Sequence, residues 1–167
     1  MITEVMEKPT SSKTTSAAGE YLTFILGDES YGIEILKVQE IRGYDAVTQI
    51  PNTPDFIKGV VNLRGKIVPI VDLCIKFHLG KVEYNEFTVV IILNLNGRML
   101  GIVVDGVSDV MALKEEQIRD VPSLVISIDT KYIVGLATVE EQMLILVDIE
   151  QLMSSQEMAL IDTATVH

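Results

Sequence analysis

The sequence predicts a mostly β protein built from two small barrels that repeat one unit. Short aliphatic segments recur between turn signals at intervals of about eight to twelve residues, which is typical of small barrels rather than of helical or parallel-sheet proteins. Residues 56–77, FIKGVVNLRGKIVPIVDLCIKF, align without a gap with residues 132–153, YIVGLATVEEQMLILVDIEQLM. Residues 32–41 align with residues 101–110 in the same way. Two copies are too few for a solenoid, which needs about three units, so we expect two like subdomains that share a core.

The positions that the two copies share are those that a scaffold would keep. Each copy begins with an aromatic residue and Ile, has a glycine three residues later (Gly59, Gly135), and ends its aliphatic run in Val-Asp. The copies differ in the middle, where the residues at 62–65, Asn-Leu-Arg-Gly, stand opposite those at 138–141, Thr-Val-Glu-Glu. We therefore expect a function that belongs to one copy at Arg64.

Local patterns predict the elements of the first copy. The expected order is a strand at 21–26, a turn at 27–30, a strand at 31–35, a helical turn at 36–40, a loop with Pro51 and Pro54, a helical turn at 54–58, and strands at 60–63 and 66–71. Gly65, as the second residue of the turn between the last two strands, predicts a type II turn with Arg64 on its outside. Pro69 cannot donate a ladder hydrogen bond, which predicts an edge strand or a bulge there.

The second copy contains the clearest hairpin. Residues 87–95 and 98–105 are rich in strand-forming residues and flank Asn96-Gly97, the pair preferred in a two-residue type I′ turn. In both copies an aspartate (Asp72, Asp148) follows a strand, and we expect its carboxylate to cap a short helix. These helices are expected at 73–79 and 149–153, and a closing helix is expected at 155–161.

The chain divides into a folded body and two tails. Residues 1–20 are rich in Ser, Thr and Ala without apolar periodicity, and we expect a disordered tail there. The polar break at 94–96 and the loop at 78–85 are candidate boundaries. We expect one subdomain at about 21–85 and another at about 86–153, with strands exchanged between them where the fold requires it, and a terminal helix or tail at 154–167.

Charge and composition exclude several classes of partner. The formal net charge is −11, of which the two tails carry −1 and −2, so the body itself is acidic and repels nucleic-acid phosphates. No apolar run approaches the roughly 20 residues of a membrane span, and no signal peptide opens the sequence, so a cytoplasmic protein without membrane insertion is expected. A single cysteine excludes an internal disulfide and fits a reducing compartment.

Residues that carry chemistry are scarce. The two histidines, His78 and His167, fall in a loop and at the terminus, and the spacings of transition-metal sites are absent. Cys74 lies in an apolar segment, where a packing thiol is expected rather than a nucleophile. Asp105 and Asp109 flank a turn and lack the spacing of a calcium loop. No glycine-rich turn opens a helix long enough to bind phosphate. We expect no metal, no cofactor and no enzymatic activity.

Four segments of the body resemble the CheW family of chemotaxis coupling proteins. They are Tyr-Gly-Ile-Glu-Ile at 31–35, Gly-Val-Val-Asn-Leu-Arg-Gly-Lys-Ile-Val-Pro at 59–69, Val-Asp-Leu at 71–73 and Gly-Ile-Val-Val-Asp-Gly-Val at 101–107. The resemblance covers about residues 20–160. It implies two SH3-like five-stranded barrels around a common core and a non-catalytic adaptor. Such an adaptor bridges the cytoplasmic tips of methyl-accepting chemotaxis receptors and the regulatory domain of the histidine kinase CheA in membrane-bound arrays.

The resemblance also implies roles for individual residues. Arg64 belongs to the family's receptor-coupling motif, and Asn62, Gly59 and Gly65 shape its loop. The remaining expected receptor contacts are Glu40, Val90, Val107 and Val110. The expected kinase contacts are Val38, Ile67 and Arg119. The resemblance implies a protein that is monomeric alone and that associates with itself, if at all, in arrays.

Purely structural interpretations of these residues stay open. Gly59 and Gly65 are equally explained as backbone devices, the three valines as core, and Arg64 as an ordinary surface arginine. Two other functions also stay open. One is a regulatory kinase module that stands alone, or an adaptor fused to a receiver domain. The other is an enzyme or a small-ligand barrel, against which the shortage of His and Cys argues.

Overall fold

The structure, a computed structural model, describes residues 19–44, 47–77, 79, 84–95, 97–119 and 132–153. The expected N-terminal tail up to residue 18, the closing helix at 155–161, both histidines and Asn96 lie outside these residues.

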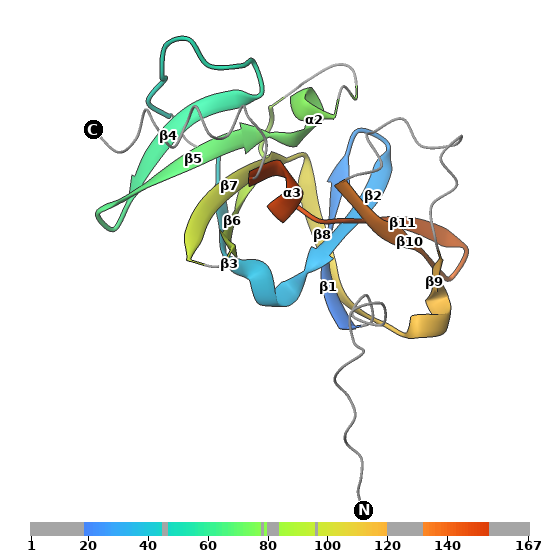
Figure 1. The fold of residues 1–167 in the computed structure, drawn as a ribbon. Helices are drawn as coiled ribbons and strands as arrows, with labels where there is room; N and C mark the ends of the chain where they lie inside the picture. The colour runs from blue at the N-terminus through green and yellow to red at the C-terminus, as the bar shows by residue number, and fades with distance from the viewer. Residues whose placement is uncertain are drawn as a thin grey trace, which may run out of the picture.

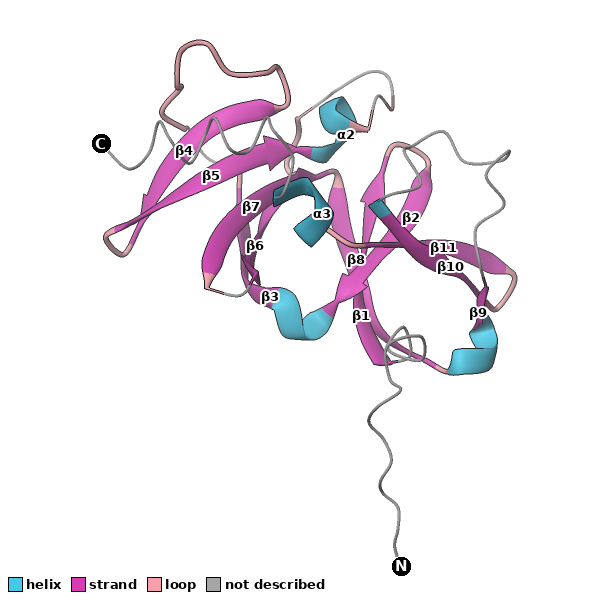
Figure 2. Ribbon diagram, in the orientation of Figure 1, coloured by secondary structure: helices cyan, strands magenta, loops and turns pink. Residues whose placement is uncertain are grey.

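Strands dominate the described residues, and every helix is a single turn, which confirms the mostly β prediction (Figure 2). The elements are β1 (Gly19–Leu26), β2 (Glu29–Glu34), η2 (Ile35–Lys37), β3 (Val38–Gly43), β4 (Ile57–Leu63), β5 (Lys66–Asp72), α2 (Leu73–Lys76), β6 (Val89–Leu95), β7 (Arg98–Val104), β8 (Gly106–Leu113), η3 (Glu115–Gln117), β9 (Ile118–Arg119), β10 (Ile133–Val139), β11 (Gln142–Val147) and α3 (Glu150–Met153).

Two curved sheets lie side by side (Figure 1). The five-stranded sheet has the order β3-β6-β7-β5-β4, and the six-stranded sheet has the order β8-β1-β2-β11-β10-β9. The five strands expected for each barrel match the first sheet, and the second sheet gains the two-residue strand β9 as a sixth.

The repeat predicted from the sequence is present, and the two copies exchange a hairpin. The β6–β7 hairpin of the second copy pairs with β3 and β5 of the first. The β1–β2 hairpin of the first copy pairs with β8 and β11 of the second. Each sheet is therefore built from both copies, and a cut of the chain at residue 86 would divide both sheets. Because of this exchange, each sheet needs strands from both copies to be complete.

A close parallel pairing recurs at the centre of each sheet. Gly32 on β2 lies opposite Leu146 on β11, and Gly101 on β7 lies opposite Ile70 on β5. A Cβ atom at Gly101 would lie 2.6 Å from the Ile70 side chain, and one at Gly32 would lie 3.0 Å from the Leu146 side chain. The strands thus carry glycine where a neighbouring aliphatic side chain crosses them, which explains why both copies share it.

The core has three parts. The largest lies between the sheets and contains side chains from both, among them Phe24 and Tyr31 of the six-stranded sheet and Ile91 and Leu93 of the five-stranded sheet. A smaller cluster lies within each sheet, around Ile70 and Ile92 in one and around Tyr21 and Leu146 in the other. The shared core expected from the repeat is the large cluster.

The helical predictions need correction. The turn expected at 36–40 is a 3₁₀ turn at Ile35–Lys37, after which the chain is already extended. The helical turn expected at 54–58 is wrong, because the chain forms a β-turn there instead. Ile57 N–H donates to the Pro54 carbonyl at 3.1 Å, and β4 begins at Ile57. The helix expected at 73–79 is shorter, Leu73–Lys76, and its capping by Asp72 is confirmed by a hydrogen bond from Ile75 N–H at 3.2 Å.

Two strand predictions also need correction. Arg64 has φ 53° and Gly65 has φ 87°, so the turn is of the type I′ class and not type II. A type I′ turn matches the right-handed twist of the flanking strands, and type II does not. Pro69 lies inside the sheet, since β5 has β4 on one side and β7 on the other. Its missing donor is tolerated because the ladder between β5 and β7 begins only at Ile70.

Candidate partner-binding site

Arg64 lies at the tip of the β4–β5 hairpin, on a turn fixed by its neighbours. The Asn62 Oδ1 atom accepts a hydrogen bond from Gly65 N–H at 2.8 Å, which closes the turn. The arginine side chain is 68% exposed, as the sequence predicts for the outside of a bend. The β6–β7 hairpin uses the same device, because Asn94 Oδ1 accepts from Gly97 N–H at 2.8 Å. The common spacing Asn-Leu-x-Gly at 62–65 and 94–97 is a sequence signal that the repeat alignment missed.

Glu40 on β3 lies within reach of this turn. The Arg64 Nη2 atom donates to Glu40 Oε1 at 2.8 Å, and Arg42 Nη1 lies 3.9 Å from Glu40 Oε2. Since β3 and β4 are the two edges of the five-stranded sheet, this ion pair spans the opening between them. Two residues predicted as receptor contacts, 24 positions apart, are therefore neighbours. Such an exposed pair contributes only about 0–1 kcal/mol to folding.

Gly59 is buried and shapes backbone rather than surface. It has φ 145° and sits at a β-bulge, where a Cβ atom would lie 2.3 Å from the Thr48 carbonyl oxygen. The loop at Thr48 is held to β4 here by two hydrogen bonds with Val60, each 2.9 Å long. Gly135 lies at the equivalent bulge of the second copy, where a Cβ atom would lie 3.0 Å from the Arg119 carbonyl oxygen. A purely structural role for the glycine at the bulge accounts for its presence in both copies.

The structure separates the three valines predicted as receptor contacts. Val90 on β6 is buried at 4% exposure in the cluster inside the five-stranded sheet. Val107 on β8 is half-buried and packs against the large core. Val110, also on β8, is 45% exposed. Val110 is thus the most exposed of the three, and it lies on the other sheet from Arg64.

The residues predicted as kinase contacts do not form one patch. Val38 is half-buried at the start of β3 and packs against the large core. Ile67 on β5 is 47% exposed and pairs in register with Asn62. Arg119 is exposed on β9, in the six-stranded sheet. Ile67 therefore adjoins the Arg64 turn, while Arg119 marks a separate surface.

Lys37 forms a cluster of ion pairs within the fold that the sequence does not predict. Its Nζ atom lies 3.1 Å from a Glu150 carboxylate oxygen, 3.2 Å from Glu34 and 3.8 Å from Asp148. Burial alone would lower the pKa of Lys37, but the hydrogen bonds to Glu150 and Glu34 raise it above its ordinary value. The lysine ties the turn that crosses between the sheets to the start of α3. The next residue upstream, Leu36, is 93% exposed.

Cys74 and Asp72 are buried side chains with partners inside the fold. Burial, with a contribution from Asp105, raises the pKa of the Cys74 thiol to about 12, which keeps it protonated as expected of a packing residue. Asp72 is buried and accepts a hydrogen bond from the Tyr84 hydroxyl. Among the residues that the structure describes, no three His, Cys, Asp or Glu side chains gather to hold a metal ion. Within the same residues, no helix has the length and apolar character to span a membrane.

Comparison with known proteins agrees with this architecture. The family model described as CheW-like domain matches residues 20–157. The chain is 64% identical over 143 residues to Chemotaxis protein CheW of Klebsiella aerogenes, covering 86% of each chain. It is 35% identical over 143 residues to Chemotaxis protein CheW of Treponema pallidum, covering 83% of this chain and 84% of that one.

A solved structure gives the same result. The scaffolding protein TtCheW from Thermoanaerobacter tengcongensis superposes with a TM-score of 0.77 at 34% identity, covering 84% of this chain and 90% of that chain. The sequence resemblance, the exchanged double sheet and these matches lead to one conclusion: the chain belongs to the CheW family.

Proposed function

We propose that this chain is a cytoplasmic, non-catalytic adaptor that couples chemoreceptors to the histidine kinase CheA and supports the assembly of their arrays. Its relatives are named chemotaxis proteins, and the matching solved structure is named a scaffolding protein. The observation that carries the proposal is the Arg64 side chain, exposed on a turn that needs no cation for its own stability.

Differences between the two copies support a surface specialised for one partner. Glu40 pairs with Ile92 across β3 and β6, as Asp109 pairs with Thr23 across β8 and β1, so the two carboxylates hold equivalent places. The counterpart of Arg64 is Glu140, which has nearly the same φ, 51° against 53°. One sheet thus presents an Arg–Glu pair at its edge, and the other presents two acids. Two partners can therefore distinguish the ends of a pseudo-symmetric molecule.

The arginine can bind a partner without losing Glu40. A guanidinium has five N–H donors in a planar fork, and the single hydrogen bond to Glu40 leaves capacity for a second carboxylate or carbonyl. Glu40 then orients the fork rather than neutralising it. A sheltered, charge-assisted hydrogen bond of this kind contributes about 1.5–3 kcal/mol.

The proposed receptor contacts are centred on Arg64, Glu40 and the exposed Val110. Four further residues support these contacts from within the fold: Asn62 and Gly65 hold the turn, Gly59 holds the bulge, and Val90 packs inside the sheet. Val107 lies beside Val110. The proposed kinase contacts are Val38, Ile67 and Arg119, with Arg119 on a separate surface from the others. Since a common core joins the two sheets, both partners would be held at a fixed separation.

Co-sedimentation with receptor cytoplasmic fragments, with and without CheA, tests the proposal. We expect the chain to pellet with the receptor alone, and we expect CheA to pellet and to be stimulated only when receptor and chain are both present. Full kinase stimulation by receptor without this chain, or failure of the wild-type chain to pellet, would contradict the proposed coupling role.

A further inference from the structure

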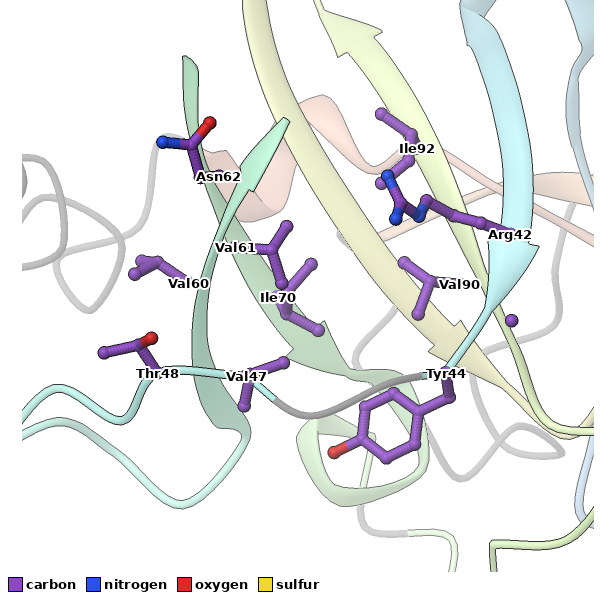
Figure 3. A pocket seen from close by; sticks show the side chains of 11 residues that line it. Arg42, Tyr44, Val47, Thr48, Val60, Val61, Asn62, Ile70, Val90 and Ile92 are labelled. Atoms are coloured by element: carbon purple, nitrogen blue, oxygen red, sulfur yellow. The ribbon is translucent and has the colours of Figure 1, made fainter. Parts of the chain in front are cut away.

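The five-stranded sheet contains a cavity of about 260 Å³ between its two edge strands, β3 and β4. The side chains of Val61, Ile70, Val90 and Ile92 form its apolar wall, and Val47 adjoins them from the loop before β4. Arg42 extends over the opening from β3 (Figure 3). For comparison, a cavity of about 150 Å³ lined by aliphatic side chains holds benzene.

The second copy carries different side chains at the positions equivalent to two residues that line this cavity. Met111 pairs with Tyr21 across β8 and β1, as Arg42 pairs with Val90 across β3 and β6. Tyr21 is buried at 2% exposure and packs with Met111 and Ile118 in the cluster of its own sheet. The five-stranded sheet therefore has a valine where its twin has a tyrosine ring. Val90 lines the cavity, and a tyrosine ring at that position would reduce its volume.

The opening of the cavity also differs in charge from its counterpart. Arg42 replaces the apolar Met111 at the equivalent position. Its guanidinium lies 3.9 Å from Glu40, whose nearer partner is Arg64 at 2.8 Å. Among the residues that the structure describes here, the Glu40 carboxylate thus faces two guanidinium groups, Arg42 and Arg64, which gives one positive charge in excess. The site combines an apolar wall with a cation at its mouth, and Tyr44, Thr48 and Asn62 complete its lining.

We propose that this cavity binds a compact apolar carboxylate, with its hydrocarbon part against Val61, Ile70, Val90 and Ile92 and its carboxylate on Arg42. An aromatic ring or a branched aliphatic chain with a short linker matches the volume, and burial of such a group supplies binding energy in proportion to its apolar area. The Arg42 side chain is 41% exposed, so its hydrogen-bonding fork remains accessible from solvent. This inference does not depend on the coupling role.

The test uses the full chain, labelled at Val and Ile methyl groups, in NMR titrations with 3-phenylpropionate and with the uncharged 3-phenyl-1-propanol. We expect shifts at the methyls of Val61, Ile70, Val90 and Ile92. Arg42→Met, which copies the second unit, should weaken binding of the acid about tenfold or more and leave binding of the alcohol unchanged. Val90→Tyr should abolish binding of both ligands by filling the cavity.

Two results would overturn the proposal. One is the lack of methyl shifts with the acid at concentrations on the order of 10 mM, which corresponds to less than about 3 kcal/mol of binding. The other is binding of the acid that is unaffected by Arg42→Met. If Val90→Tyr fails to fold, Val61→Met fills the cavity from the β4 side, and undiminished binding to that variant would place the ligand elsewhere.

Discussion

The Arg64 guanidinium donates to the Glu40 carboxylate at 2.8 Å, and the two residues belong to opposite edges of one sheet. This contact brings together two residues whose proximity the sequence does not reveal. A substitution at either position changes a surface charge and also breaks the ion pair, so a single variant does not show which of the two affects binding. The variants below separate these effects.

Reversing both charges distinguishes partner contact from structural pairing. Glu40→Arg and Arg64→Glu alone place like charges together, so each should lower the melting temperature slightly, in line with an exposed pair of about 0–1 kcal/mol. The double variant restores the pair between positions 40 and 64, and its melting temperature should rise above those of both single variants, with a small remaining loss because the arginine introduced at position 40 lies beside Arg42. Receptor co-sedimentation should stay weak in the double variant, because the partner would then meet an acid on the turn. Recovery of binding together with stability would show that only the ion pair matters.

Gly59→Ala should destabilise the fold more than Gly135→Ala. A Cβ atom at Gly59 would lie 2.3 Å from a backbone oxygen at a φ of 145°, whereas at Gly135 the nearest atom is 3.0 Å away. We expect a loss of roughly 3 kcal/mol at Gly59 and about 1 kcal/mol at Gly135, measured by urea denaturation. Equal losses would show that the Thr48 loop moves aside. Receptor binding by any Gly59 variant should be compared at matched folded fraction.

Glu141→Gly should stabilise the protein. Glu140 and Glu141 have φ of 51° and 70°, in the left-handed region where a non-glycine residue costs about 1–2 kcal/mol. The first copy has glycine at the second of these positions, Gly65. We therefore expect Glu141→Gly to raise the free energy of unfolding by about 1 kcal/mol and Gly65→Ala to lower it by a similar amount. A stability loss in Glu141→Gly would mean that the glutamate makes a compensating contact.

Cys74 should resist alkylation in the folded protein. Its pKa is raised from 9.0 to about 12, first by burial and then by Asp105, so at pH 8 about one thiol in ten thousand is ionised. The stability that the neutral thiol contributes is complete below pH 9.0 and is lost as the pH rises toward 12. We expect iodoacetamide labelling at pH 8 to follow global unfolding, with rates that rise with urea. Rapid labelling without denaturant would contradict this.

The scaffold was predictable from particular residues, and the contacts between copies were not. The aligned Gly59 and Gly135 mark equivalent bulges, and Asn96-Gly97 indicates the hairpin of β6 and β7. The hairpin exchange cannot be predicted from the periodicity of apolar residues, because strands buried on both faces do not specify which strands they pair with. A glycine at position 65 is compatible with both a type II and a type I′ turn, and the twist of the flanking strands selects type I′.

The candidate site was predictable only in part. The mismatch of Arg64 with Glu140 marks the turn that carries the exposed arginine, but the contact of Arg64 with Glu40 depends on tertiary structure. The difference between the copies at the cavity can be read from the sequence. Val90 is equivalent to Tyr21 and Arg42 is equivalent to Met111, and these differences change side-chain volume and charge. Whether a valine such as Val90 faces the interior or solvent required the curvature of the sheet.

The affinity of the chain for a receptor cytoplasmic fragment, compared between Arg64→Ala and Glu140→Ala, tests the central claim most directly. Both substitutions truncate a long charged side chain at the same place in equivalent turns, with φ of 53° and 51°, so their effects on the fold should match. We predict that Arg64→Ala weakens receptor binding about tenfold or more while its melting temperature stays close to the wild-type value. Glu140→Ala should bind the receptor like wild type. Equal affinities for wild type and both variants would contradict the assignment of Arg64 to the receptor contact.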